Sequence, residues 1–447
     1  MPSSSSHDLS RRLLLGSFGA IGASVALSAC GGSSTPPGAA PSSGSFGEGE
    51  KYDGPKVALA FWNGFTGGDG PFMKKMVDDF NTANPNVTVA MNTLQWGDFY
   101  PKVPTAVASG AGPDVACMHI DQLATNAARR VIIPLDEIAS GLKLEESDFA
   151  KVVWNAGEYK DKRYGIPLDI HPLGFYANKT LMTKAGISEM PTDKSSFEAA
   201  VAELKGKAGT ATPFWITATW PAHLIFTSLI AQFGGSIYDE EGAKATFNSD
   251  AGVEALQWMT SFISKGDSPK NVSNDAQAVA FRQQRNAMTF DGIWMMNEWA
   301  KVKGLEWEAA KFPTIGDKPA VWASSHNFVV TSQAAKDKNK LAASRAFISF
   351  ISGKSIEWAK SGQIPARKSV RDSAEFKALK VQSTLAEQLP YVQFPPSVPG
   401  IGDVTTPTYE TAVNEVVLGK KDAKAALDEA AKKADSLLKA NQSKYQA

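Results

Sequence analysis

Three kinds of side chain in this 447-residue sequence are candidates for chemistry or solute binding: histidines, carboxylates and a large set of tryptophans. The five histidines stand at positions 7, 119, 171, 223 and 326, which is not the spacing of a metal-binding motif, so the sequence predicts no metal site. The sequence contains neither a Gly-x-Ser-x-Gly nor a His-Glu-x-x-His motif. A glycosidase pair among the 46 carboxylates stays open, but nothing singles one out. The residues favour binding over catalysis, with eleven tryptophans as flat contact surfaces.

The composition narrows the class of protein further. Lysine and arginine together number 46, equal to the acidic residues, and a protein of zero net charge lacks the basic surplus of a general nucleic-acid binder. Two cysteines exclude a disulfide framework and a cysteine-based zinc module. A hydrophobic fraction of 43% is enough for folded cores in a chain of this length.

The N-terminus predicts export from a bacterial cell. Residues 1–12 are polar and end with Arg11 and Arg12, and residues 13–29 then form an apolar, glycine-rich run. This order is typical of a secretory signal, which we place at residues 1–29. The arginine pair resembles a twin-arginine signal, although the general secretory route stays open. The sequence Leu-Ser-Ala-Cys ending at Cys30 resembles a bacterial lipobox, and a plain signal with an incidental cysteine is the alternative. We therefore expect Cys30 to be lipidated, residues 30–50 to form a flexible tether, and the protein to be anchored to the outer face of the cell membrane.

The body of the chain alternates predicted strands and helices. Short apolar runs predict strands at 57–62, 87–91 and 114–118, and helical spacing of apolar residues separates them. Such alternation is typical of an α/β fold with a mostly parallel sheet. Because ligands bind beyond the carboxyl ends of the strands in these sheets, the loops at 62–70 and 119–122 are candidate binding loops.

The second half of the chain is richer in helices. Apolar spacing predicts a series of helices at 198–205, 223–233, 250–264, 341–351 and 422–440. A further strand is predicted at 328–330, and no internal repeat of solenoid length occurs.

Several segments, in order along the chain, resemble one protein family. They are Phe61–Trp62 with its loop, 99–110 with 112–115, 164–167 with 175–179, 281–294, 337–343 with 347–350, 362–365 and 419–427. This ordered set resembles the extracellular solute-binding proteins of bacterial ABC importers, in particular the sugar-binding, maltose-binding-protein-like family in its lipoprotein form. The resemblance covers nearly all of the chain after the signal.

The resemblance implies a periplasmic-binding-protein-like fold. In that fold, two discontinuous α/β lobes are joined by a hinge, and the ligand cleft lies between them. We expect the chain to cross the hinge three times, near 167–172, 312–314 and 365–370. The expected lobes are then 51–168 plus 315–367 for lobe one and 169–313 plus 368–447 for lobe two.

The resemblance also implies a set of ligand-binding residues. Aromatic rings suit the apolar faces of a sugar, and carboxylates, amides and arginine suit its hydroxyls. The implied residues are Trp62, Asn63, Phe65, Thr66, Tyr100, His119, Asp121, Gln122, Asp169, His171, Trp220, Asp291, Trp294, Trp322, Ser325, His326 and Arg367. The chain departs from the pattern at Gln122, where maltose-binding members have arginine, and at 322–326, which replaces a commoner Gly-Gly sequence. The alternatives are a buried packing role for Trp62, Trp220 and Trp294, loop capping by the histidines, and helix capping by Asp121.

The function implied is that of a receptor that performs no chemistry. It would capture a sugar or oligosaccharide by hinge closure and deliver it to the permease of an ABC importer, as a monomer without a cofactor. A polyol or glycerol-phosphate receptor is the alternative within binding proteins, and a secreted glycoside hydrolase or lyase is the alternative from another class.

Overall fold

The first of two main sheets carries the N-terminal part of the fold, in a computed structural model that describes residues 51–445 except 208, 210–211 and 271–272. Its strands run in the order β2-β1-β3-β12-β6. Their bounds are β1 Val57–Asn63, β2 Val87–Thr93, β3 Val115–His119, β6 Ile166–Pro167 and β12 His326–Val330. β1 is parallel to β2 and β3, whereas β12 is antiparallel to β3 and β6. The parallel part agrees with the predicted alternation.

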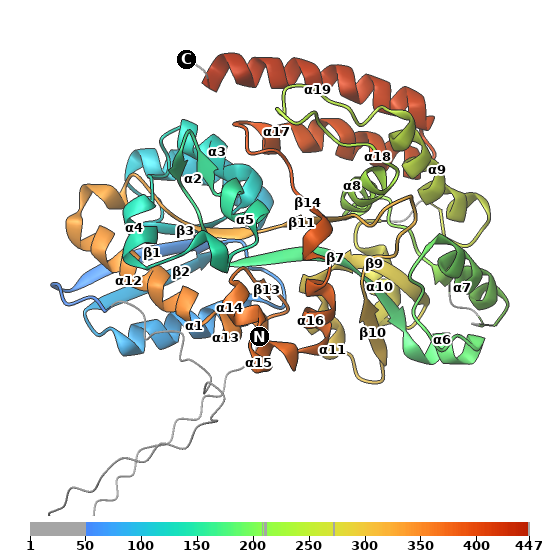
Figure 1. Cartoon of the computed structure of the whole chain (residues 1–447), viewed down its shortest axis with the longest axis horizontal. Helices are drawn as coiled ribbons and strands as arrows, with labels where there is room; N and C mark the ends of the chain where they lie inside the picture. The colour runs from blue at the N-terminus through green and yellow to red at the C-terminus, as the bar shows by residue number, and fades with distance from the viewer. Residues whose placement is uncertain (1–50, 208, 210–211, 271–272, 446–447) are drawn as a thin grey trace, which may run out of the picture. The chain divides into compact units, whose positions relative to one another are not determined.

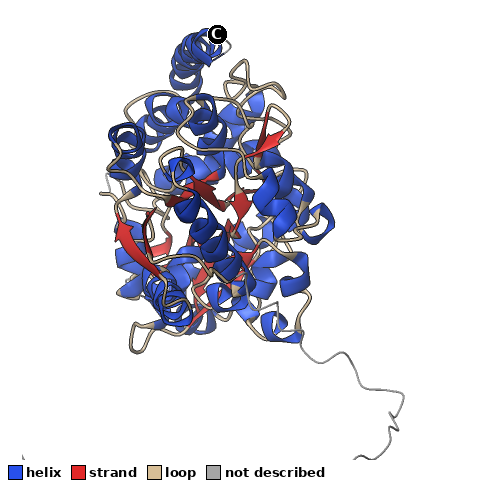
Figure 2. Cartoon of the chain, turned by 90° about the vertical axis from the view of Figure 1, so that its left-hand side faces the viewer, coloured by secondary structure: helices blue, strands red, loops and turns tan. Residues whose placement is uncertain are grey.

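Helices cover this first sheet and connect its strands (Figures 1 and 2). Their bounds are α1 Gly70–Ala83, α2 Trp96–Ser109, α3 Ile120–Ala128, α4 Asp136–Gly141, α5 Lys151–Ala156, α12 Lys338–Gly353 and α13 Ser355–Ala359. α1 buries Met73, Met76, Val77 and Phe80 along one face, as the apolar spacing predicts. The Asp337 carboxylate accepts hydrogen bonds from backbone N–H groups at the start of α12, which fixes where that helix begins.

The second main sheet is built around one long strand, β7. β7 spans Asp169–Asn178, and all ten of its residues are buried. The sheet runs in the order β14-β11-β7-β9-β8, and β10 and β13 also pair with β7. The other strands are β8 Thr212–Phe214, β9 Asn286–Gly292, β10 Trp307–Ala310, β11 Val321–Ser324, β13 Ile364–Pro365 and β14 Val392–Gln393. A small separate hairpin pairs β4 Glu158–Tyr159 with β5 Lys162–Arg163.

The helices around the second sheet include the long C-terminal ones, which pack against α8 and α9 (Figure 1). The longer members are α7 Lys194–Lys207, α8 Ala222–Gln232, α9 Asp250–Ser264, α18 Thr411–Val417 and α19 Ala423–Tyr445. The shorter ones are α6 Lys179–Ala185, α10 Ala276–Arg282, α11 Met296–Ala300, α14 Lys368–Arg371, α15 Ala374–Lys377, α16 Lys380–Ala386 and α17 Ile401–Thr405. No helix in the described part of the chain is long and apolar enough to cross a membrane.

The two sheets have separate hydrophobic cores. One core gathers Phe61, Phe80 and Phe347, and the other gathers Phe175, Phe197 and many further residues. The chain passes from the first sheet to the second between β6 and β7 and returns between β11 and β12. The chain therefore returns to the first sheet at Ser325, eleven residues after the expected hinge crossing at 312–314. The predicted signal, tether and Cys30 lie outside the described residues.

Candidate functional site

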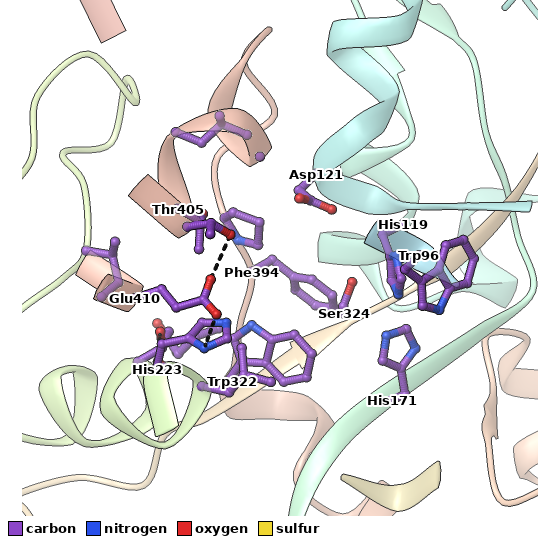
Figure 3. A pocket seen from close by; sticks show the side chains of 18 of the residues that line it. Trp96, His119, Asp121, His171, His223, Trp322, Ser324, Phe394, Thr405 and Glu410 are labelled. Atoms are coloured by element: carbon purple, nitrogen blue, oxygen red, sulfur yellow. Dashed lines mark hydrogen bonds and ion pairs between the residues drawn. The ribbon is translucent and has the colours of Figure 1, made fainter. Parts of the chain in front are cut away.

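A cavity of about 880 Å³ is lined by residues that follow or end strands of both main sheets (Figure 3). The first sheet contributes the loop after β1, the end of β3 and the start of β12. The second sheet contributes His171 on β7 and Trp322 on β11, and α8 and α17 close the cavity further along. The loops after β1 and β3 are the places where the strand pattern predicted binding.

One side of the cavity is formed by histidines that surround a buried carboxylate. We call His119, His171, His326 and Asp169 the histidine wall. Asp169 is fully buried, and its carboxylate accepts hydrogen bonds from Nδ1 of His171 (3.1 Å) and Nδ1 of His326 (2.8 Å). The Trp358 indole also donates to Asp169 over 2.7 Å. Asp169 thus joins His171, His326 and Trp358 in one hydrogen-bonded network.

The network sets the charges of this wall. Burial alone would raise the pKa of Asp169, but its electrostatic interaction and hydrogen bonds with His326 and His171 together hold that pKa well below the usual value. Burial, and then repulsion from His326, lowers the pKa of His171 to about 4 despite its hydrogen bond to Asp169. Burial and the other two histidines also lower the pKa of His119 well below the usual value. At neutral pH, Asp169 is therefore ionised, and His119 and His171 are neutral.

Tyr100 and Trp96 complete the histidine side of the cavity. The Tyr100 hydroxyl lies 2.6 Å from Nδ1 of His119 and accepts a hydrogen bond from the backbone N–H of the same residue. Trp96 stacks on His326, with ring centroids 5.6 Å apart and planes 17° apart. A side chain at Gly64 would collide with the Trp96 ring, since its Cβ would lie 2.1 Å from a ring atom. Glycine at this position therefore lets the indole reach the cavity.

A neighbouring part of the lining carries three tryptophans, which we call the tryptophan wall: Trp220, Trp294 and Trp322. Their ring centroids are 6.1 Å apart for Trp220 and Trp294 and 6.2 Å apart for Trp294 and Trp322. Trp220 is 40% exposed, and the other two are partly buried. Two of these rings lie about 6 Å from His171, so the two walls meet at that residue.

The strand end before Trp294 explains how this ring is held. A Cβ at Gly292 would lie 2.1 Å from the Trp294 ring, so the indole lies directly against the glycine backbone. Asp291 is buried beneath, where it accepts a hydrogen bond from the Gly292 N–H at 2.8 Å. Burial raises the pKa of Asp291 to about 7, against the opposing effect of its hydrogen bonds. The predicted Asp291 thus supports the wall from behind and is not one of the residues that line the cavity.

A third group, which the sequence did not indicate, lies between α8 and the C-terminal helices (Figure 3). His223 on α8 places Nδ1 3.8 Å from Glu410, and Glu410 accepts a hydrogen bond from Thr406. Phe394 and Tyr409 contribute rings to the same stretch of lining. Nothing in the local sequence marks these residues, because they come from segments far apart in the chain.

The predicted site residues fall into two sets in the structure. Those that line the cavity are Thr66, Tyr100, His119, Asp121, His171, Trp220, Trp294, Trp322 and His326. Those that do not line it are Trp62, Asn63, Phe65, Gln122, Asp169, Asp291, Ser325 and Arg367. Most of the second set support the first: Phe65 packs on His326, and Gln122 donates a hydrogen bond to Asp121. Arg367 instead forms an ion pair with Asp148.

The charged lining of the cavity is acidic. The carboxylates of Asp69, Asp121, Asp239, Glu240, Asp275 and Glu410 lie along it. Among the described residues that line the cavity, there is no lysine or arginine. Burial raises the pKa of both Asp69 and Asp121. The site therefore offers hydrogen-bond acceptors, imidazoles and aromatic faces, and no lysine or arginine side chain for an anion.

Residues 75–381 match the sequence profile of a family described as bacterial extracellular solute-binding proteins. The chain belongs to this family. The match covers more than half of the chain and includes both walls of the cavity. The family consists of binding proteins, which agrees with the absence of catalytic motifs from the sequence.

Individual relatives agree with the family assignment. The maltooligosaccharide ABC transporter solute-binding lipoprotein of Streptococcus pneumoniae is 24% identical over 354 residues, which are 76% of this chain and 80% of that protein. The fold matches that of the GacH receptor of Streptomyces glaucescens, solved unliganded and with acarbose, with a TM-score of 0.78 at 21% identity over 86% of this chain and 99% of that one. It also matches UgpB from Mycobacterium tuberculosis, solved with glycerophosphocholine, with a TM-score of 0.72 at 20% identity over 87% and 99% of the chains. The predicted two-lobe α/β binding-protein fold is confirmed.

Proposed function

We propose that this solute-binding protein captures a sugar or oligosaccharide in the cavity and delivers it to the permease of an ABC importer. The observation that carries the proposal is the tryptophan wall, whose rings face a cavity edged with carboxylates and imidazoles. A pyranose presents apolar C–H faces to rings and hydroxyls to charged or polar partners, so both parts of the lining find a use. Named relatives that bind maltooligosaccharide and acarbose support the same ligand class.

The charge of the lining favours an uncharged solute. A phosphate or carboxylate ligand calls for lysine, arginine or an open helix N-terminus, whereas the carboxylates along this cavity would repel it. Neutral hydroxyls, in contrast, donate well to ionised carboxylates. We therefore rank carbohydrates ahead of phosphate esters.

Capture by hinge closure follows from the arrangement of the lining. The lining comes from both sheets: His119 and His326 lie on strands of the first sheet, whereas His171 and the tryptophan wall lie on or beside strands of the second. A ligand that contacts both sets favours a closed arrangement over an open one. We propose lobe one as 51–168 plus 325–367 and lobe two as 169–324 plus 368–447. This moves the second crossing from the expected 312–314 to the place where the sheets change. A permease that contacts both lobes can distinguish the closed form, because closure changes their relative position.

We further propose that the mature protein is a monomer held at the outer face of the membrane by lipid on Cys30. Cys117 is a buried free thiol and offers no second attachment point. Mass spectrometry of the purified membrane form should find an acylated N-terminal Cys30, and Cys30→Ser should release the protein into the soluble fraction. A Cys30→Ser protein that stays with the membrane would contradict the anchor.

A ligand screen tests the proposed carbohydrate class. The purified protein is titrated calorimetrically, and its thermal unfolding is followed, with mono-, di- and trisaccharides. A true ligand present at about 100 times its Kd should stabilise the protein by about 2.7 kcal/mol. Trp294→Ala should abolish that effect, while Trp307→Ala, at a partly buried tryptophan of β10 outside the cavity lining, should leave the affinity unchanged. Normal sugar binding by Trp294→Ala would show that the ligand lies elsewhere.

Glycerol-phosphate esters are the second candidate, since the fold also matches the glycerophosphocholine complex of UgpB. Imidazoles of the histidine wall can donate to a phosphate at low pH. The same screen therefore includes glycerophosphocholine and glycerol 3-phosphate. Stabilisation by these esters and by no sugar would replace the carbohydrate proposal.

A further inference from the structure

Three histidines that the sequence keeps far apart meet at one point of the cavity. His119 ends β3, His171 lies near the start of β7, and His326 begins β12. One ligand atom from each lies within 4.8 Å of the other two. Figure 3 shows His119 and His171 facing the same space from separate strands. Among the described residues, these three histidines are the group of side chains placed closely enough to hold one metal ion.

The hydrogen bonds leave the same nitrogen of each ring for a ligand. Nδ1 of His171 and Nδ1 of His326 are both held by the Asp169 carboxylate, and Nδ1 of His119 is held by the Tyr100 hydroxyl. The hydroxyl oxygen of Tyr100 has two acceptor lone pairs, so it can accept from Nδ1–H as well as from the backbone. Nε2 is therefore the nitrogen left on all three rings.

This arrangement has the second shell that metal-binding histidines require. A histidine ligand usually donates its other ring N–H to a carboxylate, a carbonyl or water, which orients the ring and makes the free nitrogen a better ligand. Asp169 provides that acceptor for two rings at once, and Trp358 holds Asp169 in place.

We propose that His119, His171 and His326 bind one divalent transition-metal ion of the zinc type through their Nε2 atoms. Three imidazoles with a fourth position open are a recognised coordination set for Zn²⁺. At Zn–N distances of about 2.0–2.1 Å, tetrahedral ligand nitrogens lie about 3.3 Å apart. The rings would therefore have to turn and move closer together when the ion binds. The fourth position faces the cavity, where water or a solute oxygen would complete the shell.

The electrostatics of the wall suit a cation. A cation is favoured where negative charge lies close to its ligands. Asp169 adds a buried negative charge beneath them, and Asp69 and Asp121 add carboxyl groups along the cavity. The proposal does not rest on the carbohydrate ligand, because every group it uses belongs to the chain itself.

Zinc titration of the purified protein tests the site. The protein is prepared without a polyhistidine tag, stripped with a chelator and titrated calorimetrically with ZnCl₂ at pH 7. We expect one equivalent bound with a Kd on the order of micromolar or below. Co²⁺ in place of Zn²⁺ should give the visible absorption of a four-coordinate site. No zinc binding at these concentrations would overturn the proposal.

Histidine variants locate the ion. His119→Ala should weaken zinc binding about 100-fold or more, because loss of a direct ligand exceeds loss of an outer-shell partner, which costs about 10–100-fold. This variant is preferred for folding, since His119 is partly exposed and does not touch Asp169. His171→Gln and His326→Gln should have the same effect if they remain folded by circular dichroism.

The matched control removes another histidine of the same cavity. His223 lies on α8 next to Glu410 and outside the cluster, so His223→Ala should keep the zinc affinity of the unaltered protein. Unchanged zinc binding in His119→Ala, or equal loss in His223→Ala, would place the ion elsewhere. Repeating the sugar screen with a chelator present separates the two proposals: sugar binding that survives chelation leaves the carbohydrate proposal intact whatever the zinc result.

Discussion

The two walls of the cavity are built by different forces. The histidine wall is fixed by hydrogen bonds and charge around a fully buried carboxylate, whereas the tryptophan wall is fixed by packing and reaches solvent at Trp220. A buried ionic network tolerates little change, because each lost partner leaves a charge without compensation. Exposed aromatic rings tolerate substitution well. The comparison teaches that the buried charge of one wall restricts which residues can stand there, whereas the packed and partly exposed rings of the other leave more room for change.

Removing the charge at the centre of the histidine wall should have the largest effect. Asp169→Asn leaves N–H donors of His171, His326 and Trp358 facing an amide, and we expect a loss of about 3–5 kcal/mol in the free energy of unfolding. Urea denaturation measures it. The control is Asp148→Asn at the partly exposed ion pair with Arg367, which should lose about 1 kcal/mol or less. Equal effects of the two substitutions would show that the buried Asp169 network stabilises the protein no more than a partly exposed ion pair does.

The carboxyl group behind the tryptophan wall should make stability fall as pH rises. The pKa of Asp291 is 3.8 unfolded and about 7 folded, so between these values the folded state holds a proton that the unfolded state lacks. We expect up to about 4 kcal/mol of stability, present at about pH 4, to be lost by pH 7. Asp291→Asn should remove this slope in unfolding measurements across that range. If the unfolding free energy of the variant changes with pH as much as that of the unaltered protein, the pKa of Asp291 is not raised.

The histidine wall should show the opposite slope. The pKa of His171 is 6.5 unfolded and about 4 folded, so the unfolded state binds the extra proton between these values. Up to about 3 kcal/mol of stability, present above pH 6.5, should be lost as pH falls to 4. His171→Gln should flatten the loss of stability at acid pH. Burial lowers the pKa of His223 as well, so His223→Gln should also reduce that loss, and the double variant should reduce it further. An unchanged loss of stability at acid pH in His171→Gln would show that this ring is not held neutral.

The smallest expected effect on stability is at the exposed end of the tryptophan wall. Trp220→Ala should weaken carbohydrate binding by about 1–3 kcal/mol and change the unfolding free energy by only about 0.5 kcal/mol, since 40% of its surface is exposed. Calorimetric titration and urea denaturation measure the two quantities. Trp258 is a buried residue of α9, so Trp258→Ala should lower the unfolding free energy strongly and leave carbohydrate binding unchanged. A large stability loss in Trp220→Ala would mean that the ring is structural.

Local patterns predicted the elements well where apolar spacing was strong. The helix predicted at 250–264 is α9 with the same bounds, and the first three strands lie within two residues of their predicted ends. The crossing expected near 312–314 lies before the place where the sheets change, because β11 pairs with β7 of the second sheet. Sequence patterns locate strands, but pairing partners depend on the whole fold.

The residues that line the cavity were predictable in part, and there are physical reasons why the others were not. Trp96 begins α2 and was not among the predicted site residues, although its spacing to Phe99 and Val103 continues the apolar pattern of that helix. The histidine cluster had no local signal, because its members lie on three strands distant in sequence. Arg367 was a candidate by position alone, and its partner Asp148 lies in another segment.

The exposure of Trp220 gives the protein a built-in optical signal. Among the described residues, Trp220 and Val152 are the large hydrophobic side chains that stand exposed, and the remaining tryptophans are wholly or partly buried. A solute that covers the Trp220 indole would move it from water into an apolar setting, so its fluorescence emission would shift to shorter wavelength. The fluorescence intensity of Trp294 and Trp322, which lie about 6 Å from His171, would change at the same time. Binding and closure can thus be followed in real time without attaching a dye.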